Sequence, residues 1–496
     1  MFKSRFITSS AMLLLLSGCG IIGPDYERPS IETPSLWPFS GTSDEQQQQQ
    51  EAAVKVGWWK SYNDPVLTDL ITEGLKANGD LEIAAARVSQ AQAQADFATA
   101  NRFPSLDVQG QATRSEASIN SAVVPAAAQF GAIGRPVNSF SLGAVLSYEL
   151  DLWGRLARAS ESARAQLLSA DYNRDAVELA VISQIAASYF NLRALDAQVL
   201  ITEQTITARE QAYGIEKKQF DVGSTNGLTF RQAESELAAT RAALPQLRQR
   251  REEQLTALSV LLGRTPKQIT EAIIARGSEV DALPVPPVAP PLVPGDLPST
   301  LLERRPDIAA AEQQLASGTA EIAAARANYF PRISLSGLLG LNSIDAGNLF
   351  EGDSRTWQIG GSAVGPLLDF GRTSANVDLA KSLRDEDLAN YRQVIRTSFK
   401  EVRDALAAQG NTTERQEAET ARQNSLSEAL RLARLRYDAG YSSNLEVLDA
   451  QRGLYSAQLD RVSAKLERLI ASVNLYKSLG GGWSTEKPAQ TGQEGK

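Results

Sequence analysis

Histidine is absent from this 496-residue chain, and cysteine occurs once, as Cys19. Without histidine there can be no His-ligated metal site and no histidine general base. With one cysteine there can be no disulfide within the chain. The sequence also lacks a glycine-rich loop of the kind that cradles phosphate. These absences argue against an enzyme, and we expect no catalytic residue, no metal site and no cofactor other than a covalent lipid.

Aromatic residues are also scarce, at 6% of the chain, and the formal net charge is −8. The acidic balance argues against nucleic acid as a partner. Alanine is abundant, which suits long helices that pack closely. Beyond the N-terminus, no apolar run approaches the length of a membrane-spanning helix.

The N-terminus has the features of a targeting segment. Lys3 and Arg5 precede an apolar run, and the run ends in Leu16-Ser17-Gly18-Cys19, which resembles a bacterial lipobox. The alternative is an ordinary secretory signal with a chance cysteine. We interpret residues 1–18 as a lipoprotein signal peptide and Cys19 as the lipidated residue. Position 20 is Gly rather than the Asp that retains such lipoproteins at the inner membrane, so the expected destination is the outer membrane.

Two proline-rich segments divide the rest of the chain. Residues 19–57 predict a lipid-anchored extended arm, and residues 284–298 predict a stiff linker. Between and after them lie a first repeat over 58–283 and a second over 299–482, and a disordered tail is expected over 483–496.

Each repeat contains one stretch of strict apolar and polar alternation, at about 104–153 and about 331–369. Each alternating segment is about ten residues long, apolar on one side and polar on the other, which is typical of a transmembrane β-strand. The sequence therefore predicts two β-hairpins and four amphipathic strands.

The two repeats align residue by residue. The helical stretch from Gly79 to Pro104 matches that from Pro306 to Pro331, 227 positions later, and from Gly154 onward the offset to Gly371 is 217. The ten-residue difference falls in the first hairpin, so the helices are predicted to be equal in length. We expect Pro104, Pro331, Gly154 and Gly371 to mark the junctions between strands and helices.

A long helix follows each hairpin. From Gly154 to about Asp221 it would have roughly 67 residues and measure about 100 Å, too long for a globular domain. Helix-turn-helix tips are predicted near 221–227 and 438–444, with Gly223 and Gly440 as left-handed helix stops. Ser443, with Glu446 three residues later, forms the sequence of a capping box.

Four strands are too few to close a bacterial barrel, which needs about eight. An open sheet edge in a membrane would leave backbone groups unsatisfied. The chain is therefore expected to oligomerise, and three copies would supply twelve strands. The predicted fold is mixed α and β: a trimeric 12-stranded transmembrane β-barrel, continued by a long periplasmic α-helical barrel.

These features resemble the TolC-like outer membrane factor family, in its lipoprotein branch, over nearly the whole chain. The residues that carry the resemblance are Gly23-Pro24-Asp25-Tyr26, Trp58-Trp59, the run Glu149-Leu150-Asp151-Leu152-Trp153-Gly154-Arg155, the run from Leu301 to Ile308, and Leu448-Asp449-Ala450-Gln451-Arg452. The resemblance implies a homotrimer in the outer membrane that docks onto a periplasmic adaptor and an inner-membrane pump of the RND type. It would serve as a passive efflux duct for drugs or other small toxic compounds.

The resemblance also implies a periplasmic gate at Leu445, Glu446, Asp449 and Arg452 in the second-repeat tip. Threefold symmetry would make each residue a ring, with carboxylates at a narrow mouth that attracts cations. The alternatives are that Glu446 only caps its helix, and that Asp449 and Arg452 form a solvated pair three residues apart. Some family members hold the closed state with an acidic residue at the position of Thr229, and the threonine here lacks that charge.

Two other functions compete with efflux. A duct for protein or peptide secretion would share every feature above, although the lipobox favours efflux. A periplasmic adaptor lipoprotein would also carry a lipobox and a helical hairpin, but it would lack the four strands and the 217-residue duplication.

Overall fold

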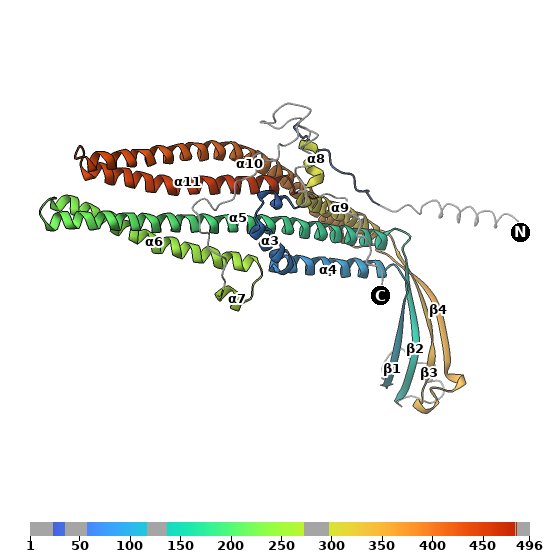
Figure 1. Cartoon of the computed structure of the whole chain (residues 1–496). Coiled ribbons are helices and arrows are strands. Elements are labelled where there is room, and N and C mark those ends of the chain that lie inside the picture. The colour runs from blue at the N-terminus through green and yellow to red at the C-terminus, as the bar shows by residue number, and fades with distance from the viewer. Residues whose placement is uncertain (1–22, 35–56, 117–135, 272–296, 482, 484–496) are drawn as a thin grey trace. The chain divides into compact units, whose positions relative to one another are not determined.

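The computed structural model describes residues 23–34, 57–116, 136–271, 297–481 and 483, and its helices and strands follow one order twice along the chain (Figure 1). The predicted signal peptide, Cys19, most of the proline-rich linker and the tail beyond Trp483 lie outside the described residues. The first repeat contains η1 (Trp58–Tyr62), α3 (Pro65–Ala77), α4 (Gly79–Ala100), β1 (Ser105–Ser115), β2 (Val137–Leu150), α5 (Arg155–Asp221), α6 (Gly227–Leu261) and α7 (Pro266–Thr270). The second contains α8 (Leu297–Arg304), α9 (Pro306–Ala327), β3 (Arg332–Ser343), η3 (Ala346–Asn348), η4 (Gly352–Ser354), β4 (Arg355–Val364), α10 (Arg372–Asp438) and α11 (Asn444–Ser478).

The helices of the two repeats match in length, as the constant sequence offset predicts. There are 22 residues in α4 and in α9, 67 in α5 and in α10, and 35 in α6 and in α11. Helix α6 continues through Pro245. None of the helices in the described part of the chain combines the length and apolar character needed to span a bilayer.

The chain forms two compact units, and the long helices contribute to both. The first unit combines Met1–Pro29, Ser89–Ser169 and Glu312–Asn390. The second combines Ser30–Val88, Ala170–Ala311 and Tyr391–Lys496.

The first unit holds a four-stranded antiparallel sheet in the order β1-β2-β3-β4 (Figure 1). The two strands of each predicted hairpin pair with each other. The hairpins are joined because β2 of the first pairs with β3 of the second, with Leu150 opposite Ile333. Strands β1 and β4 are consequently the two edges of the sheet among the described strands.

Proline and glycine occupy the corners where strands and helices join. Pro104 and Pro331 lie between a helix end and a strand start, where the missing N–H and fixed φ end a helix. Gly154 and Gly371 start the long helices with φ of 76° and 88°, a left-handed backbone that glycine adopts without strain. Asp151 follows β2 and accepts hydrogen bonds from two N–H groups at the start of α5, so it caps that helix.

The described part of the predicted arm is extended and lies against the helices of the first unit. The Arg28 guanidinium donates to both carboxylate oxygens of Glu312 at 2.7 Å, and Tyr26 Oη donates to the same carboxylate at 3.2 Å. Asp25 forms an ion pair with Arg158 of α5 at 2.5 Å. The arm is therefore held by paired charges on two different helices.

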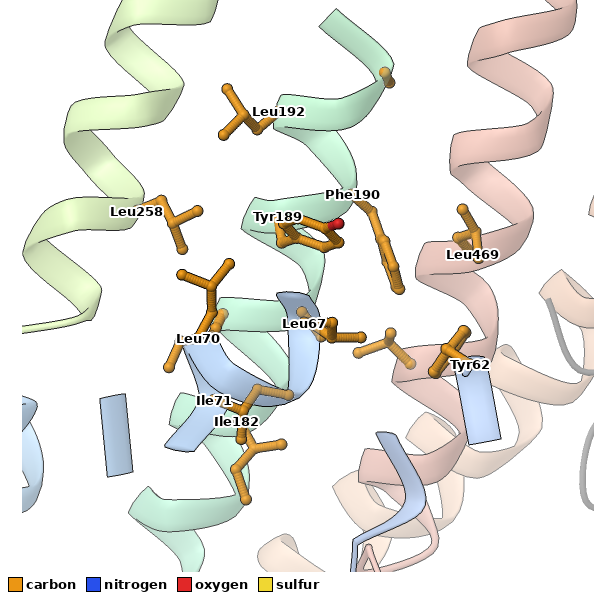
Figure 2. Close-up of a cluster of buried hydrophobic side chains, with 14 of the residues drawn as sticks. Tyr62, Leu67, Leu70, Ile71, Ile182, Tyr189, Phe190, Leu192, Leu258 and Leu469 are labelled. Atoms are coloured by element: carbon orange, nitrogen blue, oxygen red, sulfur yellow. The ribbon is translucent and has the colours of Figure 1, made fainter. Parts of the chain in front are cut away.

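The largest hydrophobic core lies in the second unit, where η1, α3, α5, α6 and α11 meet (Figure 2). Tyr189 and Phe190 of α5 lie between Leu258 of α6 and Leu469 of α11. Burying a side chain of this size stabilises the fold by about 1.5–3 kcal/mol. This core joins the helical hairpins of the two repeats.

Candidate functional site at the second-repeat tip

Both tips have the backbone that the sequence predicts. Gly223 and Gly440 have φ of 75° and 77°. In each tip the glycine N–H donates to the carbonyl three residues earlier, and the next N–H donates to the carbonyl five residues earlier. This pattern is the Schellman motif, which satisfies the last free carbonyls of a helix.

The first turns of α11 bear the four predicted gate residues. Leu445 and Asp449 are exposed, and Glu446 Oε2 is 3.8 Å from Arg436 of α10. The Asp449 carboxylate is 3.9 Å from Arg452, at the outer limit of an ion pair. The structure thus brings the four side chains onto one short stretch of helix, but it gives Arg452 a stronger partner.

That partner is Glu236 of α6, in the first repeat. Both Nε and Nη2 of Arg452 donate to Glu236 Oε1, the former at 3.2 Å. Glu236 Oε2 also pairs with the buried Arg209 of α5 at 3.1 Å. Asp449 is therefore not the main partner of Arg452 within one copy, and the acidic partner from the first repeat lies seven positions beyond Thr229.

Buried Arg209 completes this link. Its guanidinium donates to the Glu236 carbonyl at 2.7 Å and to Thr240 Oγ1, and it lies 5.7 Å from the centre of the Tyr455 ring. Burial lowers the pKa of Arg209, and Arg452 lowers it further, whereas Glu236 raises it. The Glu236 carboxylate thus offsets the charge of two arginines and connects α5, α6 and α11.

The capping box expected at Ser443 does not form. Ser443 is the N-cap of α11, but its side chain accepts no capping hydrogen bond, and the N–H of Glu446 donates to the Ser443 backbone carbonyl at 3.2 Å. The Glu446 carboxylate instead lies toward Arg436. The structure therefore does not support the reading of Glu446 as a capping acid only.

A second link from the first repeat was not expected from the sequence. Buried Glu216 of α5 accepts hydrogen bonds at Oε1 from Asn444 at 2.7 Å and from Tyr437 Oη at 3.1 Å. These donors flank the second-repeat turn, so one carboxylate holds both sides of the tip. Burial raises the pKa of Tyr437, and its hydrogen bond to Glu216 raises it further.

Glu216 aligns with Ala433 in the second repeat, so the duplication gives no signal for its role. The first-repeat tip is built differently. It stacks Phe220 on Phe230 at 5.0 Å between ring centres, and Asn226 caps α6 by accepting from the Thr229 N–H. In the second tip, Tyr437 and Asn444 instead bind the Glu216 carboxylate of the other repeat.

A groove of about 610 Å³ lies beside these links, between α5, α10 and α11. Arg209, Gln451 and Tyr455 line it together with Arg431 and Asp438. Its walls combine charged and polar side chains with apolar ones. Within the described residues, no group of three or more Asp, Glu, Cys or His side chains could hold a metal ion.

The family model described as outer membrane efflux protein matches this chain twice, over residues 70–264 and 297–481. The chain belongs to this family. The predicted resemblance and internal repeat are thereby confirmed. The chain is an outer-membrane efflux channel protein.

Known relatives match over almost their full lengths. The chain is 34% identical over 479 residues to the probable efflux pump outer membrane protein TtgC of Pseudomonas putida, covering 97% of this chain and 95% of TtgC. It is 32% identical to the probable outer membrane lipoprotein SilC of Salmonella typhimurium, covering 97% of this chain and 100% of SilC. The crystal structure of the CmeC outer membrane channel of Campylobacter jejuni superposes with a TM-score of 0.86, at 26% identity, over 95% of this chain and 96% of that one.

Proposed function

We propose that three copies of this chain form a passive export duct for drugs or other small toxic compounds, gated at the second-repeat tip. The observation that carries the proposal is the four-stranded sheet with two open edges, in a chain of the outer membrane efflux protein family. Unpaired strand edges in a bilayer cost several kcal/mol for each unsatisfied backbone group. Three copies would close these edges into one barrel of twelve strands.

The proposed assembly includes an anchor and two protein partners. A lipid on Cys19 would fix the arm to the outer membrane, and the paired charges of Arg28 and Arg158 hold the following residues against the helices. The helical tips would meet a periplasmic adaptor that connects the duct to an inner-membrane pump of the RND type. This arrangement is supported by relatives named as outer-membrane components of efflux pumps.

The gate would be held closed by the two links to the first repeat. Arg452 bound to Glu236 and the tip bound to Glu216 both restrain the α10–α11 hairpin against α5 and α6. Glu446 and Asp449 would form the acidic mouth, and threefold symmetry would bring six carboxylates together. Opening would require these links to break, with loss of their charge-assisted hydrogen bonds.

Single-channel conductance in planar bilayers tests the gate. The wild-type protein should conduct poorly, and Glu446→Ala with Asp449→Ala should conduct more and lose preference for cations. Unchanged currents and selectivity would contradict the assignment of these residues to the mouth.

Two further measurements test the assembly and the cargo. The mass of the detergent-solubilised protein should be that of three protomers, and the mass of one protomer would contradict the duct. Deleting the gene should increase susceptibility to toxic compounds. Unchanged susceptibility with loss of a secreted protein would favour the secretion duct instead.

A further inference from the structure

An aromatic joint connects the two repeats inside the first unit. Trp153, which follows β2, stacks on Phe330, which precedes β3, with ring centres 4.7 Å apart. Trp153 Nε1 also donates to the carbonyl of Pro331 at 2.9 Å. The joint therefore fixes the corner where the paired strands β2 and β3 meet their helices.

The equivalent residues of this joint lie apart at the two edges of the sheet. By the repeat offsets of 217 and 227, Phe370 corresponds to Trp153, and Phe103 corresponds to Phe330. The Phe370 side chain is 91% exposed and that of Phe103 is 66% exposed. Phe370 also has φ of 50°, a region that bulky side chains rarely adopt, whereas Trp153 has no such backbone.

Strand register obeys the same offsets. In the first hairpin Ser105 is opposite Ser147, and in the second Arg332 is opposite Val364, their exact repeat equivalents. The pairing of β2 with β3 can therefore be carried over to β4 and β1. Val145 of β2 lies opposite Leu338 of β3. Their repeat equivalents, by the offsets of 217 and 227, are Ser362 of β4 and Gln111 of β1.

This carried-over register matches the side-chain faces of the two edge strands. It places Ala112 opposite Gly361, and Gly110 opposite Ala363, so the apolar side of β1 continues the apolar side of β4. A slip of one residue would place the apolar side of each strand beside the polar side of the other. The pattern of the edges thus independently excludes any slip by an odd number of residues.

One chain cannot make this pairing, because β2 and β3 separate β1 from β4 in the sheet. We propose that β4 of one copy pairs with β1 of a second copy with Ser362 opposite Gln111, and that Phe370 stacks on Phe103 of that copy. The occupant of the exposed edge is a second copy because its β1 supplies the equivalents of both β3 and Phe330. The proposal deepens the proposed trimeric duct and rests on it.

Disulfide trapping in the full-length protein tests the register. Ser362→Cys with Gln111→Cys should give cross-linked bands at two and three protomer masses on a non-reducing gel after mild oxidation. Ser362→Cys with Gly110→Cys, displaced by one residue and on the other face, should stay at one protomer mass. Each single variant serves as a control for other thiol reactions, and Val145→Cys with Leu338→Cys should form its bond within one chain.

Failure of the duct and failure of the register give different results. A wild-type mass of one protomer in detergent would overturn the trimer itself. A wild-type mass of three protomers, with cross-linking by the displaced pair and none by the Ser362 and Gln111 pair, would overturn the register alone.

A double-mutant cycle tests the aromatic joint. Phe370→Ala and Phe103→Ala should each lower the temperature at which the trimer dissociates, and the double variant should be little worse than either. Phe370→Trp, which introduces the residue of the first repeat, should retain the wild-type value. Phe350→Ala, at an exposed loop phenylalanine, is the matched control and should have no effect. Fully additive decreases in the dissociation temperature, or no decrease in either single variant, would overturn the proposed stacking of Phe370 on Phe103.

Discussion

Arg452 in α11 donates two hydrogen bonds to Glu236 in α6, so the first repeat of the chain directly restrains the second-repeat tip. The Arg452 side chain is 59% exposed and that of Glu236 only 16%. Such a pair is stronger than a fully solvated one because the carboxylate is largely removed from water.

Breaking this link should favour opening of the proposed gate. Arg452→Ala removes an interaction worth about 1 kcal/mol, which corresponds to roughly a fivefold shift toward opening. We expect a higher open probability in planar bilayers, and high salt should reduce the difference from wild type. Arg231→Ala is the control, because the contacts of Arg231 that the structure describes are an ion pair with exposed Glu234 and a cation–π contact with Phe230, both on its own helix. Equal open probabilities for wild type and Arg452→Ala would contradict the role of the link.

The Glu216 link should control local opening of the turn. Tyr437→Phe removes one of the two hydrogen bonds to Glu216 Oε1, and bonds to charged groups contribute about 1.5–3 kcal/mol. We expect amide hydrogen exchange around residues 437–446 to accelerate by about tenfold or more, while exchange in the core is unchanged. Tyr441→Phe, at an exposed position in the same turn, is the control. An exchange rate in Tyr437→Phe equal to that of the control would rule out this restraint.

The repeat explains why so much of the fold follows from the sequence. A constant offset predicts helices of equal length, and Gly223 and Gly440 show where each hairpin turns. The strands follow equally well, because alternation with period two is specific to strands that are buried or lipid-facing on one side. These features are local, and neighbouring residues in the chain determine them.

The links that hold the tip are not local. Glu216 and Tyr437 lie 221 positions apart, and their contact depends on how two long hairpins pack together. Nothing around Glu216 distinguishes it from other helical glutamates. The prediction of a capping box at Ser443 was wrong for a related reason, since the Glu446 carboxylate lies toward Arg436 on another helix. Motifs predict which bonds are possible locally, and packing selects among them.

Alkaline pH should destabilise the core of the second unit. Burial raises the pKa of Tyr62 and of Tyr189 well above the ordinary value of 10.0. As the pH rises, these hydroxyls lose their protons in the unfolded chain at a lower pH than in the folded protein. Their contribution to the free energy of unfolding is therefore complete below pH 10. It declines as the pH rises from there through the folded-state pKa. Each tyrosine should then cost about 1.4 kcal/mol per pH unit in the free energy of unfolding.

Thermal melting followed by circular dichroism between pH 8 and about 12 checks this dependence. Tyr62→Phe should show a shallower decline above pH 10 than wild type, although its stability at pH 8 is lower because the hydrogen bond to Ser472 is lost. Tyr441→Phe should follow the wild-type curve. Parallel curves for Tyr62→Phe and wild type would show that the buried hydroxyl does not carry the effect.

Two glycines, one after α6 and one after α11, should tolerate substitution far less well than the glycines at the tips. A Cβ at Gly263 would lie 1.8 Å from the backbone oxygen of Ala77, and one at Gly480 would lie 2.0 Å from that of Arg304. Both have positive φ, and neither oxygen can move without shifting a helix end. Gly440 has a similar φ, but a Cβ there would meet nothing within 4 Å.

Alanine at the three positions separates steric conflict from backbone strain. Gly440→Ala should cost only about 1 kcal/mol for the left-handed conformation, and the protein should still assemble. Gly263→Ala and Gly480→Ala add the clash to this strain, so we expect losses of several kcal/mol and a marked drop in melting temperature and yield. Melting of the three purified variants under one condition checks the order. Equal losses at all three positions would mean that strain alone matters and that the close approach of the helix ends does not stabilise the fold.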